Sequence, residues 1–229
     1  MEILKNKNIL VVGAHSDDEV LGVGGSILKA KSNNSKVDVL IVTDSASAQY
    51  NEKEKLENRF SNLHQCSNVL KVDNVFQWNF PDMRLDTIPH FELNKKLEEF
   101  IFQSDYDTIF IHHPYDINKD HQILFSSLMV ACRPIPNQKI KSILTYYTPS
   151  STEWGGYEKN RNFCPNIFVD IEDYIDLKIE GLSKYTDEIR DFPHPRSLEN
   201  VENLAKYFGS QVGLRFAEPF CLIRSIDIY

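Results

Sequence analysis

Residues 8–19 read NILVVGAHSDDE, an apolar run that is followed at once by five polar or ionisable side chains. The run is nearly continuous in aliphatic residues, as expected for a strand that is buried on both faces of a parallel sheet. Residues 15–19 therefore come at the carboxyl end of this strand, where a helix is predicted to begin. Open α/β sheets bind their ligands at this end of the strands.

Strand and helix patterns alternate outward from this stretch. Further strands are predicted over residues 37–43, 75–79, 108–112, 142–148, 167–171 and 218–226. Helices are predicted over residues 20–31, 53–70, 91–103, 122–132 and 173–189, and Ser197 caps a last one. This order predicts an α/β fold, a Rossmann-like doubly wound and mostly parallel sheet with helices on both faces. Since no linker or repeat interrupts the chain, residues 1–229 are predicted to form a single domain.

Glycines at positions 22, 24 and 25 resemble a phosphate-binding loop, but they lie well inside the first predicted helix. A dinucleotide-binding fingerprint needs its glycines at the turn between strand and helix. We therefore expect these glycines to allow close packing of the helix against the sheet.

The charge and hydropathy of the chain limit its partners. A net charge of −8 argues against a general nucleic-acid binder, because such a protein needs a basic face. A sugar nucleotide is not excluded, since one local arginine can hold a phosphate. No apolar run is long enough to span a bilayer, and the first residues lack signal-peptide features, so we expect a cytoplasmic protein. The pattern leaves the oligomeric state open, and a homo-oligomer is compatible with it.

A second polar cluster, HHPYDINKDH, occupies residues 112–121 at the end of the strand at 108–112. If the two strands are neighbours, both clusters meet at one edge of the sheet, which predicts a metal site at the ends of the first and fourth strands. Catalytic zinc takes about three His, Asp or Glu ligands. His15 and Asp18 have suitable spacing, and His121 is a natural third ligand.

Neighbouring carboxylates have separate expected roles at this edge. Asp116 and Asp120 are available to orient the imidazoles of the ligands, and His113 is expected beside them. Asp17 points another way in the turn and could face the metal-bound water. The alternative for Asp17 and Asp18 is simple capping of the helix that follows.

These residues also carry a family resemblance. Residues 15–19 (HSDDE) resemble the A-H-P-D-D-E signature of the PIG-L/LmbE-like zinc-dependent N-acetyl-sugar deacetylases, and residues 116–121 (DINKDH) resemble that family's second metal motif. The similarity extends to Thr43-Asp44, to Arg59 and to residues 80–86. Residues 132–134, 150–154 and 193–197 resemble a bacterial branch associated with surface-sugar biosynthesis.

The resemblance implies zinc on His15, Asp18 and His121, with Asp17 as the general base. Fe²⁺ or Co²⁺ would suit the same N/O donors. The implied reaction is hydrolysis of the N-acyl amide of a small-molecule amino sugar, a sugar conjugate or a nucleotide sugar. The favoured acyl group is acetyl. It further implies that Arg59 and Asp82 line the substrate pocket, and Asp44 is expected to join them.

Two departures from the family pattern affect this picture. Ser16 replaces the proline of the signature, which is a mild change. Asn118 stands where many relatives carry a histidine, and an amide can donate a hydrogen bond to an oxyanion but cannot supply a proton. The leaving amine must be protonated, so we expect His194 to supply the acid, with His113 or a second use of Asp17 as the alternatives.

Two later residues are expected to contact the substrate. Trp154 lies in the long loop at 149–166 and is suited to stacking on a sugar ring or a base. Arg196 is suited to binding a phosphate or carboxylate.

Other functions are compatible with parts of the pattern. One is a metal-dependent hydrolase of a different amide. Another is a receiver-like regulatory domain, whose acidic site also follows a first strand, and a third is an inactive sugar-binding relative. Receivers have no use for His15 and His121, so bound metal would distinguish the enzyme.

Overall fold

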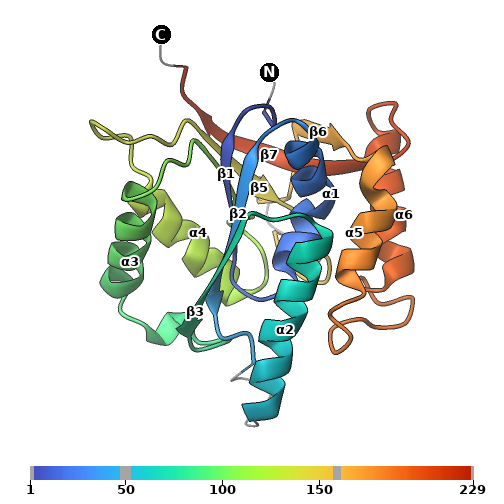
Figure 1. The fold of residues 1–229 in the computed structure, drawn as a ribbon, viewed down its shortest axis with the longest axis horizontal. Helices are drawn as coiled ribbons and strands as arrows, with labels where there is room; N and C mark the ends of the chain where they lie inside the picture. The colour runs from blue at the N-terminus through green and yellow to red at the C-terminus, as the bar shows by residue number, and fades with distance from the viewer. Residues whose placement is uncertain (1–2, 47–52, 157–160, 228–229) are drawn as a thin grey trace.

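A computed structural model describes residues 3–46, 53–156 and 161–227 of the chain, with side chains described from residue 58 onward in the helix that begins at Lys53. Its centre is a seven-stranded sheet in the order β3-β2-β1-β4-β5-β7-β6 (Figure 1). The strands are β1 (Asn8–Gly13), β2 (Lys36–Thr43), β3 (Asn74–Phe80), β4 (Thr108–His112), β5 (Ser142–Tyr146), β6 (Ile167–Asp170) and β7 (Ala217–Ser225).

The pairs from β3 to β5 are parallel, and β7 runs antiparallel to both β5 and β6. The predicted mostly parallel, doubly wound sheet is confirmed. The strand order reverses beside β1, so β1 and β4 are neighbours and their carboxyl ends lie together.

Helices cover both faces of the sheet (Figure 1). On one face lie α3 (His90–Phe102) and α4 (Lys119–Ala131), and on the other lie α1 (Asp18–Ser32), α2 (Lys53–Val69), α5 (Ile175–Leu182) and α6 (Leu198–Ser210). Each layer has its own apolar core against the sheet. Among the described residues, no helix is long and apolar enough to cross a bilayer.

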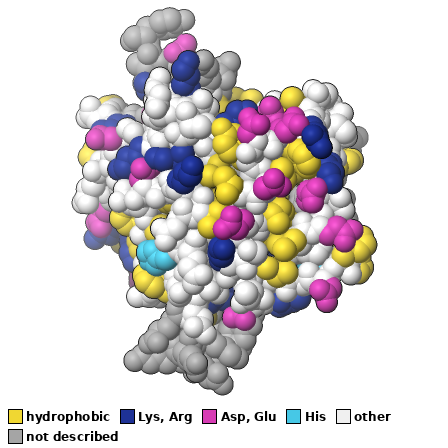
Figure 2. Space-filling view, turned by 45° about the vertical axis from the view of Figure 1, so that its right-hand side comes forward, with side chains coloured by type: hydrophobic (Ala, Val, Ile, Leu, Met, Phe, Trp, Pro, Cys, Tyr) yellow, Lys and Arg dark blue, Asp and Glu magenta, His cyan; other side chains and the backbone are white. Residues whose placement is uncertain are grey.

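The surface over α2, α5 and α6 mixes charge and apolar groups. Figure 2 looks toward this side of the molecule and shows lysine, arginine, aspartate and glutamate side chains interspersed with hydrophobic ones.

Gly22 and Gly25 of α1 face the sheet, as predicted, whereas Gly24 faces side chains of other helices, among them Lys178 of α5. A methyl group on Gly22 would lie 2.3 Å from Cδ2 of Tyr146, and one on Gly25 would lie 2.7 Å from Cγ2 of Ile171. A side chain at either position would overlap its neighbour, so these glycines set how closely α1 approaches the sheet.

One predicted helix is wrong in its length. The pattern predicts a helix over residues 173–189. In the structure a short 3₁₀ turn (Glu172–Tyr174) comes first, and α5 follows it and ends at Leu182. Beyond Leu182 the chain turns inward, and Tyr185 and Glu188 become buried in contact with α1 and α2. Tertiary contacts at these two side chains therefore override the local preference for helix.

Candidate active site

The turn between β1 and α1 places its polar side chains at the carboxyl end of the sheet. Asp17 lies at the start of α1 with a φ of 117°, in the left-handed region that favours glycine. The side chain of Glu19 accepts a hydrogen bond from the Asp17 N–H at 3.1 Å, and the Tyr185 hydroxyl donates to Glu19 at 2.5 Å. These buried bonds hold the turn in its strained form.

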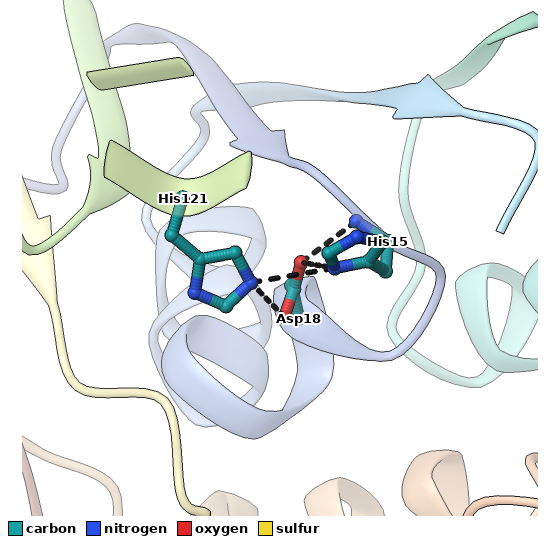
Figure 3. Close-up of side chains that lie close together, drawn as sticks. All are labelled: His15, Asp18 and His121. Carbon is teal, nitrogen blue, oxygen red and sulfur yellow. Dashed lines mark hydrogen bonds and ion pairs between the residues drawn. The ribbon is translucent and has the colours of Figure 1, made fainter. Parts of the chain in front are cut away.

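His15, Asp18 and His121 come together where β1 and β4 end. Figure 3 shows their side chains directed toward one another: His15 comes from the turn before α1, Asp18 is the first residue of α1, and His121 lies in the first part of α4. His121 Nε2 lies 3.3 Å from His15 Nδ1 and 3.5 Å from Asp18 Oδ1, and His15 Nδ1 lies 3.6 Å from Asp18 Oδ2. Tetrahedral zinc with bonds of about 2.0–2.2 Å separates its ligand atoms by about 3.3–3.6 Å. The three donors therefore fit a single ion of this kind.

Carboxylates face the far nitrogen of each imidazole. His121 Nδ1 lies 3.1 Å from Asp116 Oδ2, and His15 Nε2 lies 3.2 Å from both Asp82 Oδ1 and Asp120 Oδ2. Asp116 is itself fixed by the hydroxyls of Ser151 and Thr152. Such carboxylate contacts set the tautomer and direction of a ligating imidazole.

His112 also belongs to this site, although no role was predicted for it. Its ring stacks on that of His121 with centroids 3.6 Å apart, and its Nε2 lies 3.2 Å from Asp18 Oδ2. Burial lowers the pKa of His112 to about 4, so the ring is neutral at neutral pH. Although burial alone would raise it, the pKa of Asp18 is held well below its usual value by His112 and His121. The only sequence signal for His112 was its place at the end of a buried strand.

Asp17 lies beside the donor set and faces the pocket. Only 3% of the residue is exposed, and this burial raises the pKa of its carboxyl to about 6 against the opposing charge of Arg196. The Nη1 group of Arg196 donates to Asp17 Oδ2 at 3.1 Å.

Glu188 joins two arginines that the sequence had placed near the substrate. It accepts from Nη1 of Arg196 at 2.7 Å and pairs with Nη2 of Arg59. Its side chain is 5% exposed, and all three residues line the pocket. No motif or periodicity marks Glu188, because its importance arises only from residues far away in the sequence.

The pocket above these groups has a volume of about 180 Å³. Arg59, Asp82 and Asn118 are among the residues that line it. Asn118 caps α4 through its Oδ1, which accepts from the Asp120 N–H at 2.9 Å, and its Nδ2 lies 3.6 Å from the sulfur of Met83.

Four predicted residues are placed differently from the expectation. His194 and Trp154 lie outside the lining with their rings 6.5 Å apart. His113 faces the carbonyl of Arg161 at 3.1 Å, away from the donor set, and Asp44 accepts from the Ala46 N–H at 3.1 Å and also lies outside the lining. The segment carrying His194 instead brings Arg196 into the pocket.

The chain is similar to a known protein family and to two known deacetylases. The PIG-L profile, described as GlcNAc-PI de-N-acetylase, matches residues 10–132, which include the three candidate metal ligands His15, Asp18 and His121. An Escherichia coli protein described as uncharacterized deacetylase YaiS is 29% identical over 190 residues, covering 79% of this chain and 91% of that protein. The diacetylchitobiose deacetylase of Thermococcus kodakarensis is 22% identical over 236 residues, covering 97% and 85%.

The fold is also that of a solved deacetylase. The N,N'-diacetylchitobiose deacetylase from Pyrococcus horikoshii aligns with a TM-score of 0.78 and 22% identity, over 95% of this chain and 84% of that one.

Proposed function

The chain belongs to the PIG-L family, and from that premise we propose that it hydrolyses the N-acyl amide, N-acetyl first, of an amino sugar or sugar conjugate with the help of a divalent metal ion. The family and its deacetylase relatives indicate a hydrolytic deacetylase, which excludes the receiver-like alternative. The observation that carries the proposal is the donor set of His15, Asp18 and His121, whose spacing fits one tetrahedral ion.

Zinc is the first choice for this site, and Fe²⁺ or Co²⁺ suits the same donors. When bound, such an ion supplies Lewis-acid activation of water and of the amide carbonyl. His15, Asp18 and His121 hold it, while Asp116, Asp120 and Asp82 keep the two imidazoles in the required tautomer and direction.

Asp17 is the proposed general base. Its carboxyl is ionised at neutral pH because its pKa of about 6 lies below that pH, and it lines the same pocket as the donors. Arg196 occupies Oδ2, which leaves Oδ1 to accept the proton of the attacking water. A base with a pKa near the working pH serves such proton transfer well.

We assign the acid role to Asp17 as well. Asn118 cannot donate a proton, and His194 lies outside the pocket lining with a pKa that burial and Arg196 lower from its usual value. The proton that Asp17 takes from water is therefore the one that it returns to the leaving amine. Asn118 Nδ2 is left as a hydrogen-bond donor for the oxyanion, and Arg59 and Asp82 contact the sugar.

Two aspartate variants test this division of roles. Asp17→Asn should retain one metal ion per chain and lose most of its acetate release, whereas Asp18→Asn should lose the metal. His194→Gln is the matched control, and it should keep both metal and turnover. Equal loss of metal in both aspartate variants would show that the two roles are wrongly divided.

A further inference from the structure

The outer side of α3 carries four residues that we call the α3 stripe: Phe91, Lys95, Glu98 and Phe102. Phe91 is 74% exposed and Phe102 is 53% exposed. The four side chains line one groove together with Ile135, which is exposed as well. Large apolar side chains that are exposed singly are normal, but a group of them in one groove marks a binding surface.

The stripe follows from the spacing of its residues along the helix. With about 3.6 residues per turn, steps of four, three and four positions keep the side chains on one side of α3. The buried residues of the same helix, Leu93, Leu97 and Ile101, lie on the other side and belong to the core beneath it. Since α3 lies at one side of the molecule (Figure 1), the stripe faces outward.

The stripe has the same order in both directions apart from the sign of its charges. Phe91 lies four positions before Lys95, and Phe102 lies four positions after Glu98. Two antiparallel α3 helices related by a two-fold axis between Lys95 and Glu98 would therefore bring each phenylalanine against the other phenylalanine of the second copy. The same operation brings Lys95 of each copy against Glu98 of the other. A two-fold interface requires a surface that is complementary to itself, and this stripe meets the requirement.

The two charged residues are available for such a contact. Lys95 Nζ lies 3.8 Å from Oε1 of Glu99 in its own helix, and Glu98 Oε1 lies 3.9 Å from Nη2 of Arg133. Both pairs are long and solvent-exposed, and pairs of this kind contribute little to stability. Exchanging them for pairs between two copies therefore costs little.

We propose that the α3 stripe binds the same stripe of a second copy of this chain, so that the protein forms a two-fold dimer through antiparallel α3 helices. A partner of another kind would have to match the stripe but would not require it to be complementary to itself. The stripe extends over about 16 Å of helix, which is short for a stable interface, so we expect a weak dimer with a Kd of about 10–100 µM.

Sedimentation equilibrium over a series of protein concentrations measures this Kd. Phe102→Ala should raise it at least about tenfold, because the truncated contact occurs twice in a two-fold dimer. Tyr207→Ala is the matched control, since Tyr207 is an aromatic residue of α6 that is 60% exposed and lies outside the stripe. The control should keep the Kd of the wild type.

Exchange of the two charges tests the antiparallel arrangement. Lys95→Glu and Glu98→Lys should each raise the Kd about tenfold, and the two substitutions in one chain should restore it. An equimolar mixture of the two single variants should also dimerise, because each chain then supplies the charge that the other lacks. Lys206→Glu, which reverses a half-exposed charge of α6, is the control and should leave the Kd unchanged.

Three results would overturn the proposal. The first is a wild-type protein that stays monomeric at about 1 mM. The second is a dimer whose Kd is unchanged in Phe102→Ala and in both single charge variants. The third is a lack of recovery in both the doubly exchanged chain and the mixture. Because no enzymatic activity is measured, the proposed deacetylase function stands or falls separately.

Discussion

Arg196 Nη1 lies 3.1 Å from Oδ2 of Asp17, although 179 positions separate the two residues in the chain. Glu188 Oε2 also accepts from the same Nη1, at 2.7 Å. Arg196, which the sequence suggested as a ligand for a phosphate or carboxylate of the substrate, thus contacts the proposed base and is better described as a positioning residue for it.

Replacing Arg196 should impair turnover more than substrate binding. Arg196→Gln loses a charge-assisted hydrogen bond to Asp17, so we expect kcat to fall about 10- to 100-fold with metal content unchanged. Arg196→Lys should recover part of this loss, and added methylguanidine should recover part of the activity of Arg196→Ala. A purely structural role predicts no rescue by the small guanidine, which steady-state kinetics would show directly.

Glu188 should contribute strongly to stability. It is buried and pairs with two guanidinium groups, so Glu188→Gln leaves both with less compensation. Breaking a buried ion pair on one side costs about 3–5 kcal/mol, and urea unfolding of the two proteins at the same pH measures it. Glu99→Gln, which removes an exposed pair with Lys95, is the control and should cost less than about 1 kcal/mol. Equal small effects would refute the proposed role of Glu188.

The pH–rate profile should have an acidic limb, a fall in kcat/KM toward low pH, that is set by the pKa of Asp17. Its pKa is raised to about 6, so a fall in pH through that value protonates the base and lowers kcat/KM up to tenfold per unit. A bound cation favours the carboxylate and moves the limb to lower pH. Removing the positive charge in Arg196→Gln does the opposite, so its pH–rate profile should shift to higher pH. A shift to lower pH would contradict the contact between the two residues.

A glycine of α1 should be intolerant of even a methyl group. Gly22→Ala would place Cβ 2.3 Å from the buried ring of Tyr146, and overpacking of this kind costs about 1–3 kcal/mol. Gly181→Ala in α5 is the matched control, because its Cβ would meet its nearest neighbours at 3.4 Å. The control should gain up to about 1 kcal/mol from helix propensity. Thermal unfolding that ranks the two variants in the reverse order would disprove the close packing of α1.

The sequence predicted the donor set because its members sit in two short local patterns, each directly after a buried strand. The observed strand order, in which β1 and β4 are neighbours, then brings His15, Asp18 and His121 together; the sequence gives this adjacency only as a condition, because alternating strands and helices predict a parallel sheet without fixing its order. Nothing in the local pattern could predict the role of Glu188 in the pocket. The sequence around it has the pattern of a helix, but the helix ends at Leu182, and Glu188 pairs with Arg59, which is distant in the chain.

Contacts between residues distant in the chain also explain why the structure differs from the prediction at residues 193–197. Sequence reasoning favoured His194 from its place between two prolines, and the structure turns the neighbouring Arg196 toward Asp17 instead. Which of two nearby side chains enters a pocket depends on the path of the backbone, and here that path brings Arg196 to Asp17 and Glu188.

Metal removal and return test the central claim most directly. Protein treated with a chelator should release no acetate from N,N'-diacetylchitobiose, and one equivalent of Zn²⁺, Fe²⁺ or Co²⁺ per chain should restore the release in wild type but not in Asp17→Asn. A metal-free protein that keeps its full turnover would contradict the assignment of His15, Asp18 and His121 to a catalytic ion.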